Sequence, residues 1–110
     1  MLPKTNRLTK KNFKNVFGKK VFHTPFFTVH ALSPSQIATY TDYKCSVVVT
    51  KKHAKKATER NSLRRYHYAA LTAAIQDQNT PQGFFIFFVK QNPTFEILIA
   101  SYRDFFIKNK

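Results

Sequence analysis

The twenty residues from Ala57 to Gln76 repeat their apolar side chains with the period of an α-helix. At about 100° per residue, one arc of this helix carries the apolar set Leu63, Tyr66, His67, Ala70 and Ala74. The opposite side carries the polar and basic set Arg60, Asn61, Arg64, Arg65 and Tyr68. A helix with two such sides must bury the first in a core and leaves the second free to meet solvent or an anion. The rest of the chain therefore has to supply that core.

A basic segment runs into this helix. Between Lys51 and Arg65 the chain has seven Lys and Arg and one acid, Glu59. The lysines that extend the basic side of the helix are Lys51, Lys52, Lys55 and Lys56. Clustered cations of this kind are typical of a surface that binds nucleic-acid phosphates. The alternative interpretation is an ordinary solvated helix face, because many charged runs are no more than that.

The composition of the whole chain agrees with a polyanion partner. Nineteen Lys and Arg stand against five Asp and Glu, which gives a formal net charge of +14 on 110 residues. An apolar content of 43%, with twelve Phe, is enough for one folded domain over residues 1–110. No apolar run approaches the roughly 20 residues that span a bilayer, and the start lacks the apolar segment of a secretory signal. We therefore expect a cytoplasmic protein with no membrane contact.

Three stretches are predicted to be strands. They are rich in β-branched and aromatic residues and end at turn residues, and they span 26–32, 43–50 and 84–90. The single Cys45 lies in the second stretch and is expected to be a small strand residue. The continuous apolar core of that stretch predicts a central place in the sheet.

Two further helices are predicted at the ends of the chain. The first spans residues 8–17, with Thr9 as N-cap and Gly18 as its stop. The last begins with Asn92 as N-cap and Pro93 in the first helical position. The first six residues and residues 108–110 are expected to fray. This order predicts a single-domain α+β sandwich in which helices cover at least one face of the sheet.

Catalytic chemistry by the protein itself is not expected. Its carboxylates are few and widely spaced, namely Asp42, Glu59, Asp77, Glu96 and Asp104. A two-metal nuclease needs several such groups together. The four histidines show no paired ligand spacing with Cys45, so we expect no zinc site and no other metal site.

Two separated motifs resemble those of the bacterial ribonuclease P protein component. One is Ser46-Val47-Val48-Val49-Thr50-Lys51-Lys52, then a seven-residue spacer, then Arg60-Asn61-x-Leu63-Arg64-Arg65. The other is the opening stretch 7–17, which looks like the first helix of that family, with two Phe four residues apart. The chain departs from the family pattern at Ser62 and Tyr68, where basic residues are usual.

The resemblance implies a fold and an activity. The implied fold is a central sheet of about four strands with three helices, in the order αβββαβα, and with a left-handed βαβ crossover. The general rule for parallel strands predicts the opposite hand. The implied activity is that of an accessory subunit of an endoribonuclease. In that endoribonuclease, a catalytic RNA removes the 5′ leader of precursor tRNA. That RNA-containing holoenzyme requires Mg²⁺, whereas the protein alone binds no cofactor.

The resemblance also assigns two sites. Contacts to the catalytic RNA fall on Arg60, Asn61, Arg64 and Arg65, extended by Lys51, Lys52, Lys55 and Lys56. Leader contacts fall on Phe13, Phe17 and Lys14, in a cleft between the first helix and the sheet. Aromatic faces accept unstacked bases with little sequence preference. The alternative for Phe13 and Phe17 is a core role, which is the usual one for Phe at helical spacing.

Other functions stay open at this point. A general structural RNA-binding or ribosome-associated protein would share the charge, size and aromatic content. A stand-alone nuclease is disfavoured by the scattered carboxylates. A DNA-binding helix-turn-helix is disfavoured because the basic helix lacks a clear partner helix and short turn. No protein partner is evident from the sequence.

Overall fold

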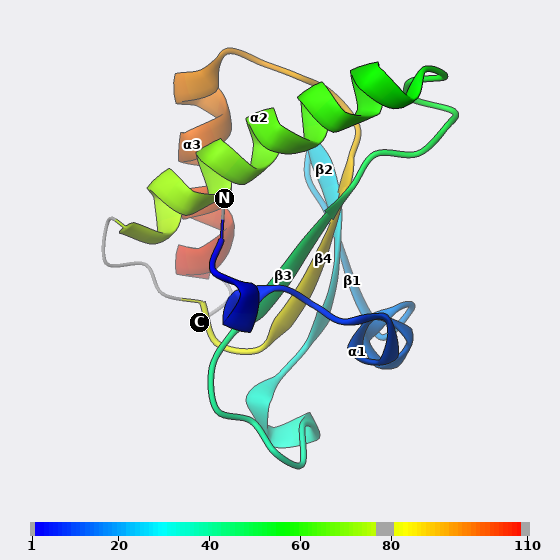
Figure 1. Cartoon of the computed structure of the whole chain (residues 1–110). Helices are drawn as coiled ribbons and strands as arrows, with labels where there is room; N and C mark the ends of the chain where they lie inside the picture. The colour runs from blue at the N-terminus through cyan, green and yellow to red at the C-terminus, as the bar shows by residue number, and fades with distance from the viewer. Residues whose placement is uncertain (1, 77–80, 109–110) are drawn as a thin grey trace.

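The computed structural model describes residues 2–76 and 81–108 and contains the predicted α+β fold (Figure 1). Its helices are α1 (Lys10–Val16), α2 (Ala57–Gln76) and α3 (Phe95–Lys108). Its strands are β1 (Lys20–His23), β2 (Phe27–Leu32), β3 (Lys44–Val48) and β4 (Phe84–Val89). Two short 3-10 turns, η1 (Lys4–Asn6) and η2 (Pro34–Gln36), complete the chain. The order αβββαβα is thereby confirmed.

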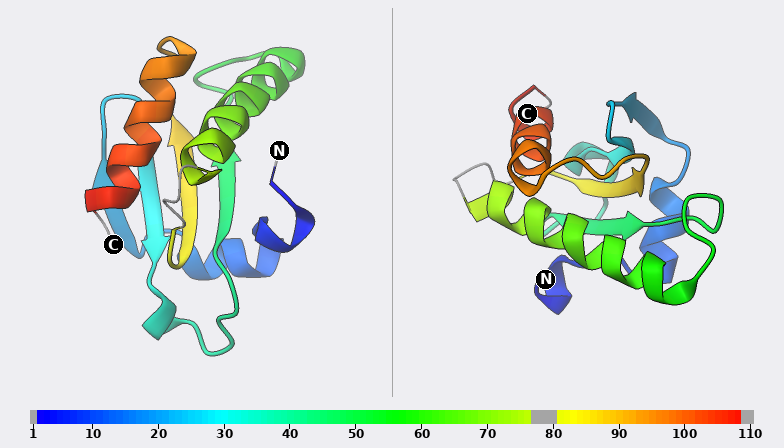
Figure 2. Two further views of the ribbon diagram at one scale, coloured as in Figure 1. Left: turned by 90° about the vertical axis from the view of Figure 1, so that its left-hand side faces the viewer. Right: turned by 90° about the horizontal axis from the view of Figure 1, so that it is seen from above.

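The four strands form one mixed sheet in the order β1-β2-β4-β3. The β1–β2 and β2–β4 pairs are antiparallel, and β3 and β4 are parallel. Helix α2 makes the crossover between the two parallel strands. With α2 and α3 toward the viewer, both strands point upward and β4 lies to the left of β3 (Figure 2, left). The crossover is therefore left-handed, as the resemblance implies and against the general rule.

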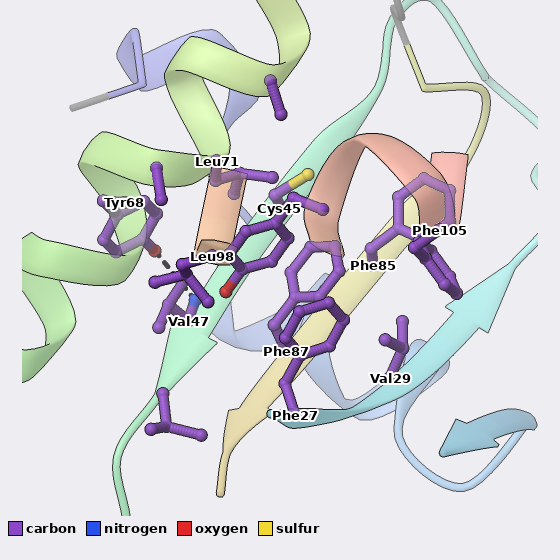
Figure 3. Packing of buried hydrophobic residues seen from close by; sticks show 14 of the residues in the cluster. Phe27, Val29, Cys45, Val47, Tyr68, Leu71, Phe85, Phe87, Leu98 and Phe105 are labelled. Atoms are coloured by element: carbon purple, nitrogen blue, oxygen red, sulfur yellow. Dashed lines mark hydrogen bonds between the residues drawn. The ribbon is translucent and has the colours of Figure 1, made fainter. Parts of the chain in front are cut away.

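Helices cover both faces of the sheet. Helices α2 and α3 pack on one face and α1 on the other (Figures 1 and 2). Between α2, α3 and the sheet lies a core of aromatic rings (Figure 3), in which Phe27 stacks on the fully buried Tyr102 at 4.4 Å between centroids. Strand β4 serves both faces, because Phe85 and Phe87 join this core while Phe84 and Ile86 join a second cluster under α1. Burial on two faces explains its aromatic density.

The prediction that β3 is central is wrong, because β3 lies at an edge of the sheet. Other groups cover that edge. The Leu8 N–H donates to the Cys45 carbonyl oxygen at 3.2 Å, and the Val47 N–H donates to the Tyr68 hydroxyl at 3.1 Å (Figure 3). These bonds satisfy edge groups that another strand would otherwise pair. Cys45 is confirmed as a buried strand residue, and burial raises the pKa of its thiol.

The prediction that the first six residues fray is also wrong for residues 2–6, and Met1 lies outside the described residues. Leu2 is 2% exposed and belongs to the main core. The Asn6 side chain donates to the Asp42 carboxylate at 3.0 Å and to the Tyr43 carbonyl at 2.9 Å. These contacts tie η1 to the segment before β3, which a reading of local sequence does not reveal. The C-terminal prediction is wrong for Lys108, which is the last residue of α3, whereas 109 and 110 lie outside the described residues.

The helix ends agree with the sequence in one case and differ in another. Thr9 caps α1 by accepting from the Asn12 N–H at 3.2 Å, and Gly18 follows with φ of 77°. Helix α3 begins at Phe95, two residues later than predicted. Asn92 does not cap it, because its side chain forms hydrogen bonds with two histidines. In the described part of the chain, no helix has the length and apolar content needed to cross a bilayer.

Candidate nucleic-acid interface

Helix α2 buries a slightly different arc from the predicted one. Its buried residues are His67, Tyr68, Ala70, Leu71 and Ala74. Leu71, which the prediction left out, is fully buried and shifts the arc toward Tyr68. Tyr68 is 7% exposed, so its assignment to the basic side is wrong. Its hydroxyl accepts from the Val47 N–H at the edge of β3, and its buried ring is not available for stacking on RNA.

The remaining predicted residues form what we call the basic face: Lys51, Lys52, Lys55, Lys56, Arg60, Asn61, Arg64 and Arg65. The four lysines, Asn61 and Arg65 are exposed, and the other two arginines are half-buried. The face comprises the first half of α2 and the loop before it, so the structure brings all eight residues into one region. Within residues 51–65, Glu59 is the single acid.

Arg60 connects the loop to the helix. Its Nη1 donates to the Ala54 carbonyl at 3.1 Å and to the Lys55 carbonyl at 2.7 Å. A guanidinium has five N–H donors, so its other nitrogens still have protons to offer a phosphate. Arg60 thus has a structural role that the sequence did not indicate.

A second contact orients Arg64. The Asn61 side-chain oxygen accepts from Arg64 Nη1 at 2.9 Å. The two residues lie three positions apart, which places them on the same face of the helix. A guanidinium held by a neighbour loses less side-chain entropy when it binds a phosphate. Asn61 therefore acts on Arg64 as well as offering its own amide.

The loop that carries the lysines is itself ordered. The N–H groups of His53 and Ala54 both donate to the Thr50 carbonyl at 3.1 Å, and Ala54 is buried in the main core. His53 Nε2 lies 3.2 Å from Asn92 Nδ2. The four lysines thus project from a loop whose backbone is held in place.

A buried polar chain runs beneath this loop. Asn92 Oδ1 lies 3.1 Å from His67 Nε2, and Tyr102 Oη lies 2.8 Å from His67 Nδ1. An amide oxygen only accepts, so Nε2 of His67 carries the proton and Nδ1 accepts from the tyrosine hydroxyl. Burial lowers the pKa of His67, which favours this neutral form. This series of hydrogen bonds joins the loop, α2, the β4–α3 connection and α3, and the part played by Asn92 was not predicted.

The second predicted site lies between α1 and the sheet. We call it the aromatic cluster: Phe13, Phe17, His30 and Phe88. The Phe17 ring lies 6.2 Å from Phe13, 5.0 Å from His30 and 6.0 Å from Phe88, between centroids. Phe17 is nevertheless 56% exposed, whereas Phe13 is half-buried against the second core cluster. The core alternative thus describes Phe13 better than Phe17, and Lys14 is exposed on the same helix.

His30 and Phe88 were not predicted as site residues. His30 Nδ1 accepts from the Gly18 N–H at 2.8 Å and so holds the end of α1 against β2. Burial, with a smaller contribution from the charge of His23, lowers the pKa of His30. The alternation of side chains along β2 could have identified His30 as a site residue. Because Phe27, Val29 and Ala31 face the main core, His30 must face the other way, toward α1.

The two regions lie on the same side of the molecule. In Figure 1 the loop before α2 lies above α1, and the view from above in Figure 2 agrees.

Metal ligands do not gather in the described residues. Across 2–76 and 81–108, no three His, Cys, Asp or Glu side chains come together as a possible metal site. Glu59 lies on α2, Glu96 and Asp104 lie on α3, and Asp42 precedes β3. Asp77 is outside the described residues.

Comparisons with known proteins agree with the geometry. A family model described as Ribonuclease P matches residues 2–109. Among solved structures, the chain is similar to the RNase P protein from Thermotoga maritima, with a TM-score of 0.72 and 19% sequence identity. The alignment covers 93% of this chain and 96% of that chain. At this identity, the structural likeness shows the fold. No curated protein matches the chain in sequence.

Proposed function

The chain belongs to the ribonuclease P family, as a bacterial-type protein component, and we propose that it binds the catalytic RNA through the basic face and the precursor-tRNA leader through the aromatic cluster. Membership of the family makes it a subunit of an endoribonuclease complex of tRNA processing and a partner of ribonuclease P RNA. The division of labour between the two surfaces is our proposal, as is a cytoplasmic place of action with the precursor tRNAs.

The basic face suits a folded RNA. Guanidinium groups match phosphate oxygens in pairs and stack on exposed bases. Arg64 is oriented by Asn61, and the lysines are presented by an ordered loop. Such contacts release counterions, so affinity falls steeply as salt rises. A net charge of +14 also reduces the repulsion between two large RNAs and thereby the Mg²⁺ they need.

The aromatic cluster suits an unpaired strand, and the exposure of Phe17 is the observation that carries this part of the proposal. Its ring is supported from below by His30 and Phe88 yet is 56% exposed. Stacking of a base on such a ring contributes about 1–3 kcal/mol with little sequence preference. That tolerance suits a subunit that accepts leaders of many sequences. Because mature tRNA has no leader, the contact also favours precursor over mature product.

In this proposal the RNA, with its Mg²⁺, carries the bond cleavage. The protein holds the leader and the catalytic RNA in register and supplies positive charge. The scattered positions of the described carboxylates fit this arrangement.

Cleavage of a precursor tRNA at low Mg²⁺ tests the proposal. We would compare the protein alone, its cognate catalytic RNA alone, and the two together. Cleavage only by the mixture supports the accessory role. Cleavage by the protein alone would reveal a protein active site. No stimulation of a competent RNA would instead indicate a general structural RNA-binding protein.

A further inference from the structure

A polar cavity of about 500 Å³ lies across strand β1 from the aromatic cluster. Its walls come from the start of β1, the end of β2, the η2 turn, the start of β4 and the last turn of α3. It belongs to neither surface described above.

Strand alternation sets the cavity apart from the aromatic cluster. On β1, Lys20 pairs with Ala31, which belongs to the main core, and Lys20 and Phe22 both line the cavity. Between them, Val21 pairs with His30 and points the other way. The cavity and the cluster therefore lie on the two sides of one short edge strand.

The chemistry of the cavity suits an anion attached to a flat apolar group. Lys20 and Lys108 are exposed at its rim. The other polar lining residues are uncharged: Ser33, Ser35, Gln36 and Gln82. None of the lining residues that the structure describes is a carboxylate. The half-buried Phe22 supplies aromatic surface next to the buried Phe85, and Lys20 Nζ lies 5.3 Å from the centroid of the Phe22 ring. A phosphate with its neighbouring base or ribose has this combination of charge and apolar area.

The path from the aromatic cluster to the cavity is short. Phe17 rests on His30, and the strand partner of His30 on the outermost strand is Val21. Neighbouring strands lie about 4.8 Å apart, so an unpaired RNA that leaves Phe17 crosses one strand to reach Lys20. Lys19 is exposed where that crossing begins.

We propose that this cavity is a second nucleotide subsite, which holds a phosphate and the adjoining base of the leader beyond the part on the aromatic cluster. This inference rests on the proposed function, since it needs a leader on Phe17. A neighbouring cavity of about 330 Å³ shares Phe22 and Lys108 but is also lined by Asp104. That carboxylate repels a following phosphate, so the subsite ends there.

Leader length provides the test. Holoenzyme would be assembled with the wild-type protein and with a Lys20→Ala/Lys108→Ala variant. Each would be titrated with mature tRNA and with precursors whose leaders have about 4 and about 15 nucleotides. At low salt we expect the variant to bind the long-leader precursor roughly tenfold more weakly. Binding of the short-leader precursor and of mature tRNA should not change. The salt dependence for the long leader should fall by about 0.7 per lost phosphate contact.

Two further variants sharpen the result. Lys4→Ala removes an exposed lysine from η1, which contacts β3 at the other edge of the sheet, and should leave all three affinities unchanged. Asp104→Asn removes the repelling charge and should tighten long-leader binding about twofold.

The outcomes separate this inference from the proposed function. If the wild-type holoenzyme prefers precursor over mature tRNA but the double variant loses nothing, or loses equally on both leaders, the subsite is wrong and the proposed function stands. If the wild-type holoenzyme shows no preference for a leader, both are overturned. Unchanged thermal unfolding of the variant, expected because both lysines are exposed, rules out a folding defect.

Discussion

The basic face and the aromatic cluster differ in how each is joined to the fold. The basic face is not part of a core. Most of its side chains project into solvent from a loop and a helix that other residues hold in place. The aromatic cluster is the outer layer of a core, because Phe13 and Phe88 pack on the second core cluster and Phe17 rests on Phe88. Binding and stability are therefore separable in the first region and coupled in the second.

The largest effect is expected at the basic face. Replacing Arg64 and Arg65 together by alanine should weaken assembly with the catalytic RNA by about 3 kcal/mol, roughly a hundredfold, because two charged hydrogen-bond donors to phosphate are lost. Titration of labelled catalytic RNA over a series of salt concentrations measures the affinity. The salt dependence should also fall by about one unit per lost phosphate contact.

The matched control is the pair Arg64→Lys and Arg65→Lys. Charge is kept in that variant while the paired donor geometry is lost, so its affinity should lie between those of the alanine variant and the wild type. The midpoint of thermal unfolding should barely move in either variant. A large loss of stability in the alanine variant would show that this face is not separable from the fold.

A smaller effect is expected at the aromatic cluster. Phe17→Ala should weaken binding of precursor tRNA by about 1–2 kcal/mol and leave mature tRNA unaffected, because one stacking ring is lost. Equilibrium binding of both RNAs to the assembled holoenzyme measures the difference. Equal losses on the two RNAs would exclude leader contact by Phe17.

Phe13→Ala is the informative companion. Its ring is half-buried against the second core cluster, so the variant should lose unfolding free energy as well as leader affinity. If Phe13→Ala and Phe17→Ala behave alike in stability, the two rings do not divide the work as their exposures indicate.

The same contrast explains what the sequence predicted. The basic face is local, since all eight residues lie within one loop and one helix, and periodicity placed nine of the ten helix positions it was used for. It failed at Tyr68, whose partner Val47 lies 21 positions away. Asn92 was misassigned for a similar reason, because a capping pattern is local whereas its histidine partners lie 25 and 39 positions away.

The sheet shows the same limit. Strand β1 has four residues and is mostly exposed, so it offers little hydrophobic pattern, and only the family resemblance implied a fourth strand. The edge position of β3 depends on its cover by the N-terminal segment, and the His30–Phe88 half of the aromatic cluster depends on the register of β2 with β4. Such pairings are set by contacts distant in sequence.

Arg60 tests whether the basic face is wholly separable from the fold. Because its guanidinium bonds two carbonyl oxygens of the preceding loop, Arg60→Ala should cost about 1 kcal/mol of unfolding free energy. Arg65→Ala, at an exposed position, should cost almost none. Urea unfolding of the two variants in parallel gives the comparison. Equal stabilities would mean that the loop does not depend on the Arg60 bonds.

The smallest effect is expected from a change of pH on stability. It depends on two histidines only: His30 in the aromatic cluster, and His67, which is buried under the loop of the basic face. Burial lowers the pKa of both His30 and His67 from the usual 6.5. As pH falls below 6.5, these histidines become protonated in the unfolded chain while they are still neutral in the folded chain. Their contribution to the free energy of unfolding is therefore fully present above pH 6.5 and is lost as pH falls from 6.5 through their lowered pKa values. Protonation also removes the acceptor for the Gly18 N–H at His30, and the acceptor for the Tyr102 hydroxyl at His67.

Thermal unfolding from pH 8 to pH 5, for the wild type and for His30→Gln and His67→Gln, measures how much of the pH dependence of stability each histidine contributes. Each variant should flatten the pH dependence. If only His67→Gln does so, protonation of His30 does not affect stability, and the coupling between stability and leader binding in the aromatic cluster rests on its phenylalanines alone.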